Sequence, residues 1–127
     1  MGLDISLWEP VKGGFRAGSY GGFMNWRRKL ADSVGIDLDS MQGFKENGTV
    51  WSGYEPFYEL LHHSDCDGVL WWDECEELLK DFEPHRDKFV EYLSDNGIIE
   101  SYYLEKYDAW FQIIKACIDV EGMLRFG

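Results

Sequence analysis

A regular apolar stripe near the C-terminal end of the chain limits what this sequence can fold into more than any other feature. Large apolar side chains recur at steps of three and four residues from Tyr103 to Cys117, which is the period of one helix face. Shorter stripes of the same kind cover residues 23–34 and 75–82, and Gly35 and Gly122 stand where helices commonly end. The pattern therefore predicts a chain that is mostly helical.

The middle of the chain carries start and stop signals for further helices. Pro56 fits the first turn of a helix, and Asp73 and Glu76 have the spacing of a capping box at the start of another. Pro84 is expected to break or kink that second helix, because proline lacks the N–H group that the helix needs. A further short helix would then end at Asn96-Gly97, so we expect about five helices in total.

Three stretches predict a small antiparallel sheet beside the helices. Apolar and polar residues alternate over residues 3–7, as in a half-buried N-terminal strand. Asn47-Gly48 is the preferred pair for a two-residue hairpin turn, which predicts a hairpin over residues 44–51. Residues 123–126 fit a last strand beside the first. With 127 residues, we expect one α+β domain spanning residues 1–127.

The net charge of −12 is unevenly distributed along the chain. Residues 1–51 hold six basic and six acidic side chains, whereas residues 52–127 hold six basic and eighteen acidic ones. Such a surface repels phosphates and disfavours direct binding of nucleic acid. It suits a basic protein partner or a cation, and solubility alone is the alternative explanation.

Several features favour a cytoplasmic protein. Residues 1–10 carry two acids and no basic residue, unlike a secretory signal peptide, and no apolar run approaches the ~20 residues of a membrane span. The three cysteines are an odd number, which fits a reducing compartment, and they are Cys66, Cys75 and Cys117.

Residues 63–74 have the spacing of an EF-hand calcium loop, with Gly68 at the sixth position. The candidate metal ligands are then His63, Asp65, Asp67 and Glu74. A histidine at the first position departs from the pattern, since imidazole nitrogen moves the preference from calcium towards zinc or manganese. The alternative is a turn without metal, in which the aspartates bond to nearby backbone and the glycine bends the chain. Both interpretations stay open.

The same segment carries a family resemblance. The string His-Ser-Asp-Cys-Asp-Gly at residues 63–68, together with residues 1–5 and 19–23, resembles a set of small uncharacterised proteins from phages and bacteria. The resemblance covers these short islands and not the whole length. It implies a phage or prophage setting, and therefore the host cytoplasm, but it implies no activity.

A glycine-rich stretch over residues 12–22 is expected to form a loop, since five of its residues are glycine. Glycine-rich loops before helices can cradle phosphates, and this is the one basic neighbourhood of the chain. The candidate ligand-binding residues are Arg16, Ser19, Arg27 and Arg28. Neither a P-loop nor a dinucleotide fingerprint is present, so the alternative is a surface loop without a ligand.

Catalytic signatures are absent from the sequence. It contains no nucleophile elbow, zinc-protease helix or paired-cysteine zinc motif. Cys66 lies beside two carboxylates, which discourage its thiolate, and His85 is expected at the surface. We therefore favour a protein-interaction module, such as a phage-encoded inhibitor of a host system. The alternatives are an EF-hand-like metal module and a phosphate- or nucleotide-binding protein or enzyme.

Overall fold

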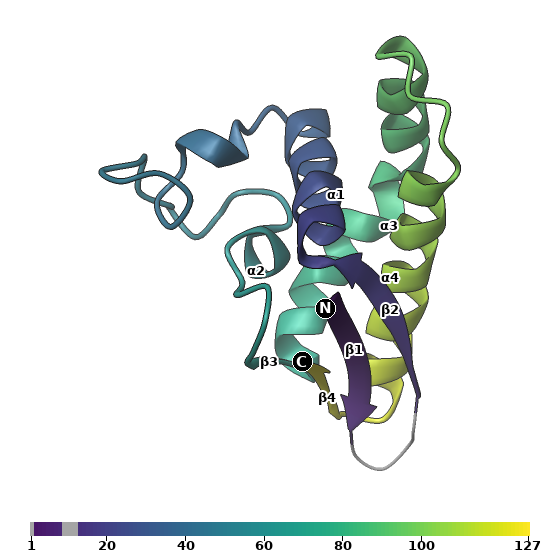
Figure 1. The fold of residues 1–127 in the computed structure, drawn as a ribbon. Helices are drawn as coiled ribbons and strands as arrows, with labels where there is room; N and C mark the ends of the chain where they lie inside the picture. The colour runs from purple at the N-terminus through teal and green to yellow at the C-terminus, as the bar shows by residue number, and fades with distance from the viewer. Residues whose placement is uncertain (1, 9–12) are drawn as a thin grey trace.

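The computed structural model describes residues 2–8 and 13–127 and has an α+β fold built on one antiparallel sheet. The strands are β1 Gly2–Trp8, β2 Gly13–Ser19, β3 Val69–Trp71 and β4 Met123–Phe126. They lie in the order β2-β1-β4-β3, so the first and last strands of the chain are central neighbours (Figure 1). The predicted N-terminal and C-terminal strands are both confirmed.

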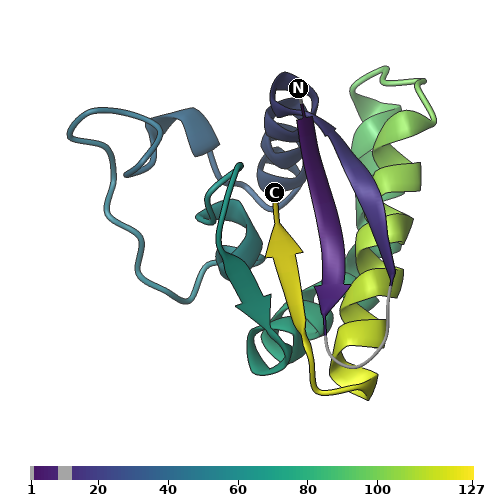
Figure 2. The same cartoon turned by 60° about the horizontal axis from the view of Figure 1, so that its bottom comes forward.

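The helices lie on one face of this sheet, behind it in Figure 2. They are α1 Tyr20–Ser33, α2 Tyr58–Leu61, α3 Trp72–Asp95 and α4 Tyr102–Asp119, with a short 3-10 turn η1 Leu38–Ser40. The described residues thus contain four α-helices, and the expectation of about five is corrected below. None of these helices combines the length and apolar character that crossing a membrane requires.

Alternation along β1 explains why one sheet face is covered. Leu3, Ile5 and Leu7 are buried, while the residues between them are exposed or half-buried. In the register of the sheet, Ile5 lies opposite Phe126 and Leu7 opposite Leu124, and all four are buried. Each such side chain contributes about 1.5–3 kcal/mol when it leaves water, so burial holds the helices against this face.

Aromatic rings join α1 to α4 in the centre of the core. Phe23, Trp26 and Trp110 are fully buried and stack with ring centroids about 6 Å apart. The indole N–H of Trp26 donates to the carbonyl of Tyr103 at 3.0 Å, which pairs a polar group that burial would otherwise leave without a partner. The helical stripes at 23–34 and 103–117 are therefore confirmed as core-facing.

Helix α3 continues through Pro84, so the predicted break is wrong. Proline in a helix interior costs about 3 kcal/mol. Two leucines and two phenylalanines buried on the inner face of α3 outweigh this cost, because each contributes about 1.5–3 kcal/mol, and six side chains of this face are buried in all. His85 is one of them: it is 8% exposed, and the expectation that it lies at the surface is also wrong. The two expected helices are thus one, which ends at Asn96-Gly97 as predicted.

The glycine-rich stretch is largely a strand and a helix start, so the loop expected over residues 12–22 is wrong. Residue 12 lies outside the described residues, residues 13–19 form β2 and residues 20–22 begin α1. A side chain at Gly14 would come within 2.5 Å of the carbonyl oxygen of Ile5. Here glycine allows β2 to approach β1 closely, and pairing with β1 decides the conformation.

The hairpin predicted over residues 44–51 does not form. Met41 with Thr49 and Gln42 with Lys45 make only isolated bridges, and the rest of the segment is irregular. Asn47 has a left-handed φ of +55°, but Gly48 does not, so the expected turn lacks its second residue. A side chain at Gly48 would lie 2.6 Å from the carbonyl carbon of Met41, and this close approach is what requires glycine there.

Candidate functional site

Residues 63–74 keep the backbone course that their pattern predicts. Gly68 has a left-handed φ of +89°, and Leu70 is buried within the edge strand β3. Glycine adopts this φ without steric cost, whereas other residues are strained. The sharp turn and the inward apolar residue of the EF-hand pattern are therefore both present, and the candidate ligands must be considered one by one.

His63 fastens the turn to the sheet. Its ring nitrogen Nδ1 lies 2.9 Å from the carbonyl oxygen of Ser64, and Nε2 lies 3.0 Å from the carbonyl oxygen of Val69. The ring also stacks on Phe126 of β4, with centroids 3.9 Å apart. A metal ligand needs a free nitrogen lone pair. In this geometry both nitrogens of His63 face backbone acceptors instead.

The aspartates of the segment do not converge on a common point. Asp65 is half-buried and its charge acts on Arg27, while Asp67 is exposed. Between them the chain is turned by Ser64, whose hydroxyl oxygen accepts from the N–H groups of Cys66 and Asp67 at 3.2 and 3.4 Å. Serine bonds of this kind define a local turn without any ion.

Glu74 caps the start of α3. Its Oε1 accepts from the backbone N–H of Trp71 at 3.0 Å, and α3 begins at the next residue. The predicted capping box at Asp73 and Glu76 is therefore wrong by position, because Glu74 is the residue that reaches back. A carboxylate in the first turn is also favoured by the helix dipole.

The four predicted metal ligands are thus not gathered around one point. Across residues 2–8 and 13–127, no three or more His, Cys, Asp or Glu side chains are placed so that they could hold a metal ion together. Two of the predicted ligands, His63 and Glu74, bond to backbone groups that shape the segment itself. The segment 63–74 is organised as a structural turn.

Arg27, a predicted ligand-binding residue, lies in the core and is 2% exposed. Its Nη1 donates to the carbonyl oxygens of Leu61 and His63 at 3.3 and 2.6 Å, and its guanidinium carbon lies 4.5 Å from the Phe23 ring centroid. Burial lowers the pKa of Arg27 to about 10, although the charge of Asp65 opposes this shift. Arg27 ties α1 to the turn that precedes the 63–74 segment.

Arg16 and Ser19, which were also predicted to bind a ligand, have separate structural roles. Arg16 pairs with Asp4 at 3.0 Å across β1 and β2. The Ser19 hydroxyl oxygen accepts from the N–H of Gly22 at 2.9 Å and so caps α1. The structure does not bring Arg16, Ser19, Arg27 and Arg28 together into one basic cluster.

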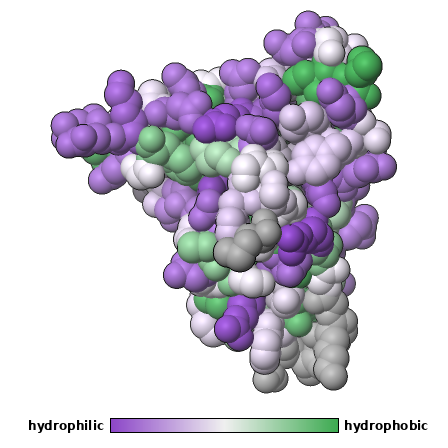
Figure 3. Space-filling view, viewed as in Figure 1, coloured by the Kyte–Doolittle hydropathy of each residue, from purple (hydrophilic) through white to green (hydrophobic). Residues whose placement is uncertain are grey.

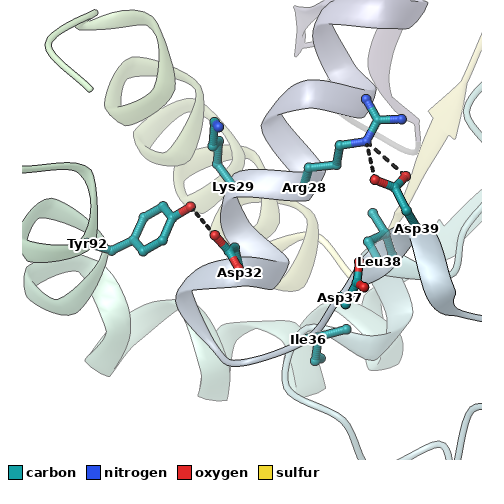
Figure 4. Close-up of a pocket in the computed structure, with 8 residues that line it drawn as sticks. All are labelled: Arg28, Lys29, Asp32, Ile36, Asp37, Leu38, Asp39 and Tyr92. Carbon is teal, nitrogen blue, oxygen red and sulfur yellow. Dashed lines mark hydrogen bonds and ion pairs between the residues drawn. The ribbon is translucent and has the colours of Figure 1, made fainter. Parts of the chain in front are cut away.

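Arg28 lines a polar pocket of about 210 Å³ between α1, η1 and α3 (Figure 4). Its Nε lies 3.0 Å from Oδ1 of Asp39, and the Tyr92 hydroxyl donates to Asp32 at 2.5 Å on the opposite wall. Burial and the bond to Asp32 raise the pKa of Tyr92. Arg28, Asp39, Tyr92 and Asp32 are therefore already paired, whereas Lys29 and Asp37, which also line the pocket, form no ion pair with a described side chain.

An apolar surface occupies the end of the α3–α4 hairpin, and we call it the tip patch. It consists of Val90, Ile98, Ile99 and Leu104 around a groove of about 310 Å³. Ile99 is 91% exposed and Val90 is 39% exposed. Figure 3 shows the green of apolar residues over this end of the molecule. Large side chains this exposed need an explanation when they gather in one place.

The tip patch lies in an acidic segment, and Glu100 lines its groove. Residues 89–105 contain four acidic residues and no basic one, and the four are Glu91, Asp95, Glu100 and Glu105. All four are exposed, and none forms an ion pair with another described side chain. The tip patch therefore combines exposed apolar area with the negative charge of the segment that carries it.

Sequence reasoning missed the tip patch, although one signal for it was present. Two isoleucines follow directly after the helix stop at Asn96-Gly97, where polar residues are expected. The chain matches no protein-family model, and no curated protein or solved structure matches it either.

Proposed function

We propose that this protein is a protein-interaction module that holds a basic protein partner at the tip patch. The observation behind the proposal is an exposed apolar groove lined by Glu100, in a segment, residues 89–105, that carries four carboxylates and no basic side chain. A partner that fits would insert an apolar side chain into the groove and place lysines or arginines around it.

The two features of the tip patch have separate roles in binding. Covering Ile99 and Val90 removes apolar area from water, and a fully buried side chain of this size contributes about 1.5–3 kcal/mol. The carboxylates mainly steer a basic partner and select against acidic ones. The same charges repel nucleic acid, so a protein is the better partner for this surface.

The biological setting that we propose is inhibition of a host system by a phage-encoded protein in the host cytoplasm. The resemblance of residues 63–68 to small phage and bacterial proteins supports the setting, and the acidic tip patch supports the mode of action. An acidic protein with one apolar anchor can occupy a basic surface that its target uses for another ligand.

A defined probe tests the binding mode before any partner is known. We expect a designed amphipathic helix of leucine and lysine to shift the backbone amide signals of residues 98–104 in an NMR titration. Ile99→Ser should weaken this binding about tenfold or more, since a central apolar anchor is worth over 1 kcal/mol. Val50→Ser is the matched control, because Val50 is 71% exposed in a different segment.

The same two variants then serve in pull-downs from host lysate. A partner that is lost with Ile99→Ser, retained with Val50→Ser and weakened by salt supports the proposal. Equal capture by both variants would refute the tip patch as the binding surface. Binding that is independent of salt would refute the role of its carboxylates.

A further inference from the structure

A further cavity, of about 290 Å³, lies where the end of α1 and residues 56–57 meet the middle of α3. Its walls include Phe57, Pro56, Pro84 and Val34, which are apolar. The polar side chains around it are Ser33, Lys80, Asp81, His85 and Lys88. It is separate from the tip patch, with which it shares no lining residue.

The hydrogen bonds of His85 define which of its nitrogens is free. Nε2 lies 2.8 Å from the hydroxyl oxygen of Ser33, and that oxygen lies 2.6 Å from the carbonyl of Leu30. A carbonyl only accepts, so the single hydroxyl proton of Ser33 goes to Leu30. Nε2 must then carry the ring proton and donate it to Ser33. Nδ1 is left as an unprotonated acceptor.

His85 lines the cavity, and its free nitrogen keeps some contact with solvent. The residue is more than nine-tenths buried, yet Nδ1 has no partner among the described residues and is not one of their fully buried, unpaired polar atoms. Burial and the charge of Lys88 lower the pKa of His85, which keeps the ring neutral near pH 7. A buried, neutral ring nitrogen with access to a cavity is available to a bound molecule.

Positive charge gathers at this cavity in an otherwise acidic region. Residues 52–127 contain only six basic side chains, and two of them, Lys80 and Lys88, line this one cavity. Lys80 also pairs with Glu77 at 3.1 Å, whereas Lys88 forms no ion pair with a described side chain. Asp81 uses one oxygen to accept from the backbone N–H of Phe57, which fixes the wall of the cavity.

We propose that this cavity binds a small organic anion with an apolar body, whose charged group lies between Lys80 and Lys88 and whose donor group bonds to Nδ1 of His85. The apolar walls at Phe57 and Pro84 would contact the body of the ligand. A phosphate and a carboxylate are the two forms of the anion that lysines hold in this way.

NMR titration of the full chain with 4-hydroxyphenyl phosphate, 4-hydroxybenzoate and phenol tests the inference. The two anions, whose hydroxyl groups can donate to Nδ1 of His85, should shift the amide signals of residues 80–88, and neutral phenol should not. Stronger binding of 4-hydroxyphenyl phosphate identifies a phosphate ligand, and stronger binding of 4-hydroxybenzoate a carboxylate. Lys88→Gln should weaken binding at least fivefold, while Lys115→Gln, an exposed lysine on α4, should leave it unchanged.

The histidine ring provides an independent readout. Long-range proton–nitrogen spectra should show His85 protonated at Nε2, with its Nδ1 signal moving when the anion binds. A ring protonated at Nδ1 would overturn the inference, and so would equal binding of phenol and the anions. Unchanged binding in Lys88→Gln would overturn it as well, and this variant lies on the surface where it does not disturb the core.

Discussion

The turn at residues 63–68 and the tip patch differ in whether their side chains have partners within the protein. The turn has the most recognisable pattern in the sequence, yet His63 and Ser64 bond to backbone groups of the turn itself or of the adjoining strand. The tip patch has no recognisable motif, yet it leaves Ile99 almost fully exposed and Glu100 without an ion pair to a described side chain. His63 and Ser64 thus have hydrogen-bond partners within the protein, whereas the exposed side chains of the tip patch are left to solvent.

This contrast shows where to look for function when sequence similarity does not indicate it. A motif of polar residues can be a means of building a turn, because histidine, serine, aspartate and glycine are the residues that turns require. Exposed apolar area with unpaired charge contradicts the usual arrangement of a protein surface. Such local contradictions are expected at functional sites.

The largest effect on stability should come from Arg27, whose guanidinium group bonds to the backbone at the start of the turn at residues 63–68. Arg27→Met keeps much of the volume but leaves the carbonyls of Leu61 and His63 without this donor. Buried groups left unpaired cost about 1–3 kcal/mol each, so we expect a loss of about 3 kcal/mol in unfolding free energy. Urea unfolding measures it. The control is Arg28→Met, which removes an exposed ion pair worth under about 1 kcal/mol.

Gly68→Ala should be the next most damaging change. The new methyl group would lie 3.3 Å from Cε1 of His63, at a φ of +89° that alanine rarely adopts. We expect a loss of about 1–2 kcal/mol. Gly21→Ala is the matched control, because nothing lies within 4 Å of its added methyl group and the helix gains about 0.5 kcal/mol from alanine. Equal losses of stability in both variants would contradict the claim that the turn at residues 63–68 requires glycine at position 68.

Glu74→Gln should cost about 0.5–1 kcal/mol in thermal unfolding, because the first turn of α3 loses a favourable charge. Calcium, manganese and zinc should leave the wild-type melting temperature unchanged, since the turn already uses these groups itself. An ion that binds the native state must raise that temperature. A rise abolished by Glu74→Gln, and by Asp65→Ala combined with Asp67→Ala, would restore the metal site that the loop spacing predicts.

Ile99→Ser should have the smallest effect on stability and the largest on binding. Its side chain is 91% exposed, so we expect a change within about 0.5 kcal/mol in urea unfolding. A loss above 1 kcal/mol would mean that the tip patch supports the fold. It would then belong with the turn at residues 63–68, and the contrast between the two regions would disappear.

Part of the candidate sites was visible in the sequence. The sharp bend at Gly68 and the buried Leu70 follow from the spacing of the loop, and both are found. The purpose of His63 was not visible, because its partners Val69 and Phe126 become neighbours only when β3 and β4 pair. The separation of Arg16, Ser19, Arg27 and Arg28 was not visible either, because each bonds to a different partner that only the folded chain brings near.

Periodicity along the chain was enough to predict the two core helices, the first and last strands and the end of α3 at Asn96-Gly97. Each of these depends on which face of an element is apolar and on a local stop signal, and both are written in neighbouring residues. Charge placement likewise predicted the acidic C-terminal half, though not the surface where that charge stays unpaired.

Contacts between distant segments decided the rest. Pro84 lies inside α3 because burial along the whole helix exceeds the cost of one lost hydrogen bond. Residues 13–19 form a strand because β1 lies beside them, and Arg27 is buried because the 61–63 turn offers carbonyls to it. These outcomes depend on free energies shared between residues far apart in sequence, and no local pattern records them.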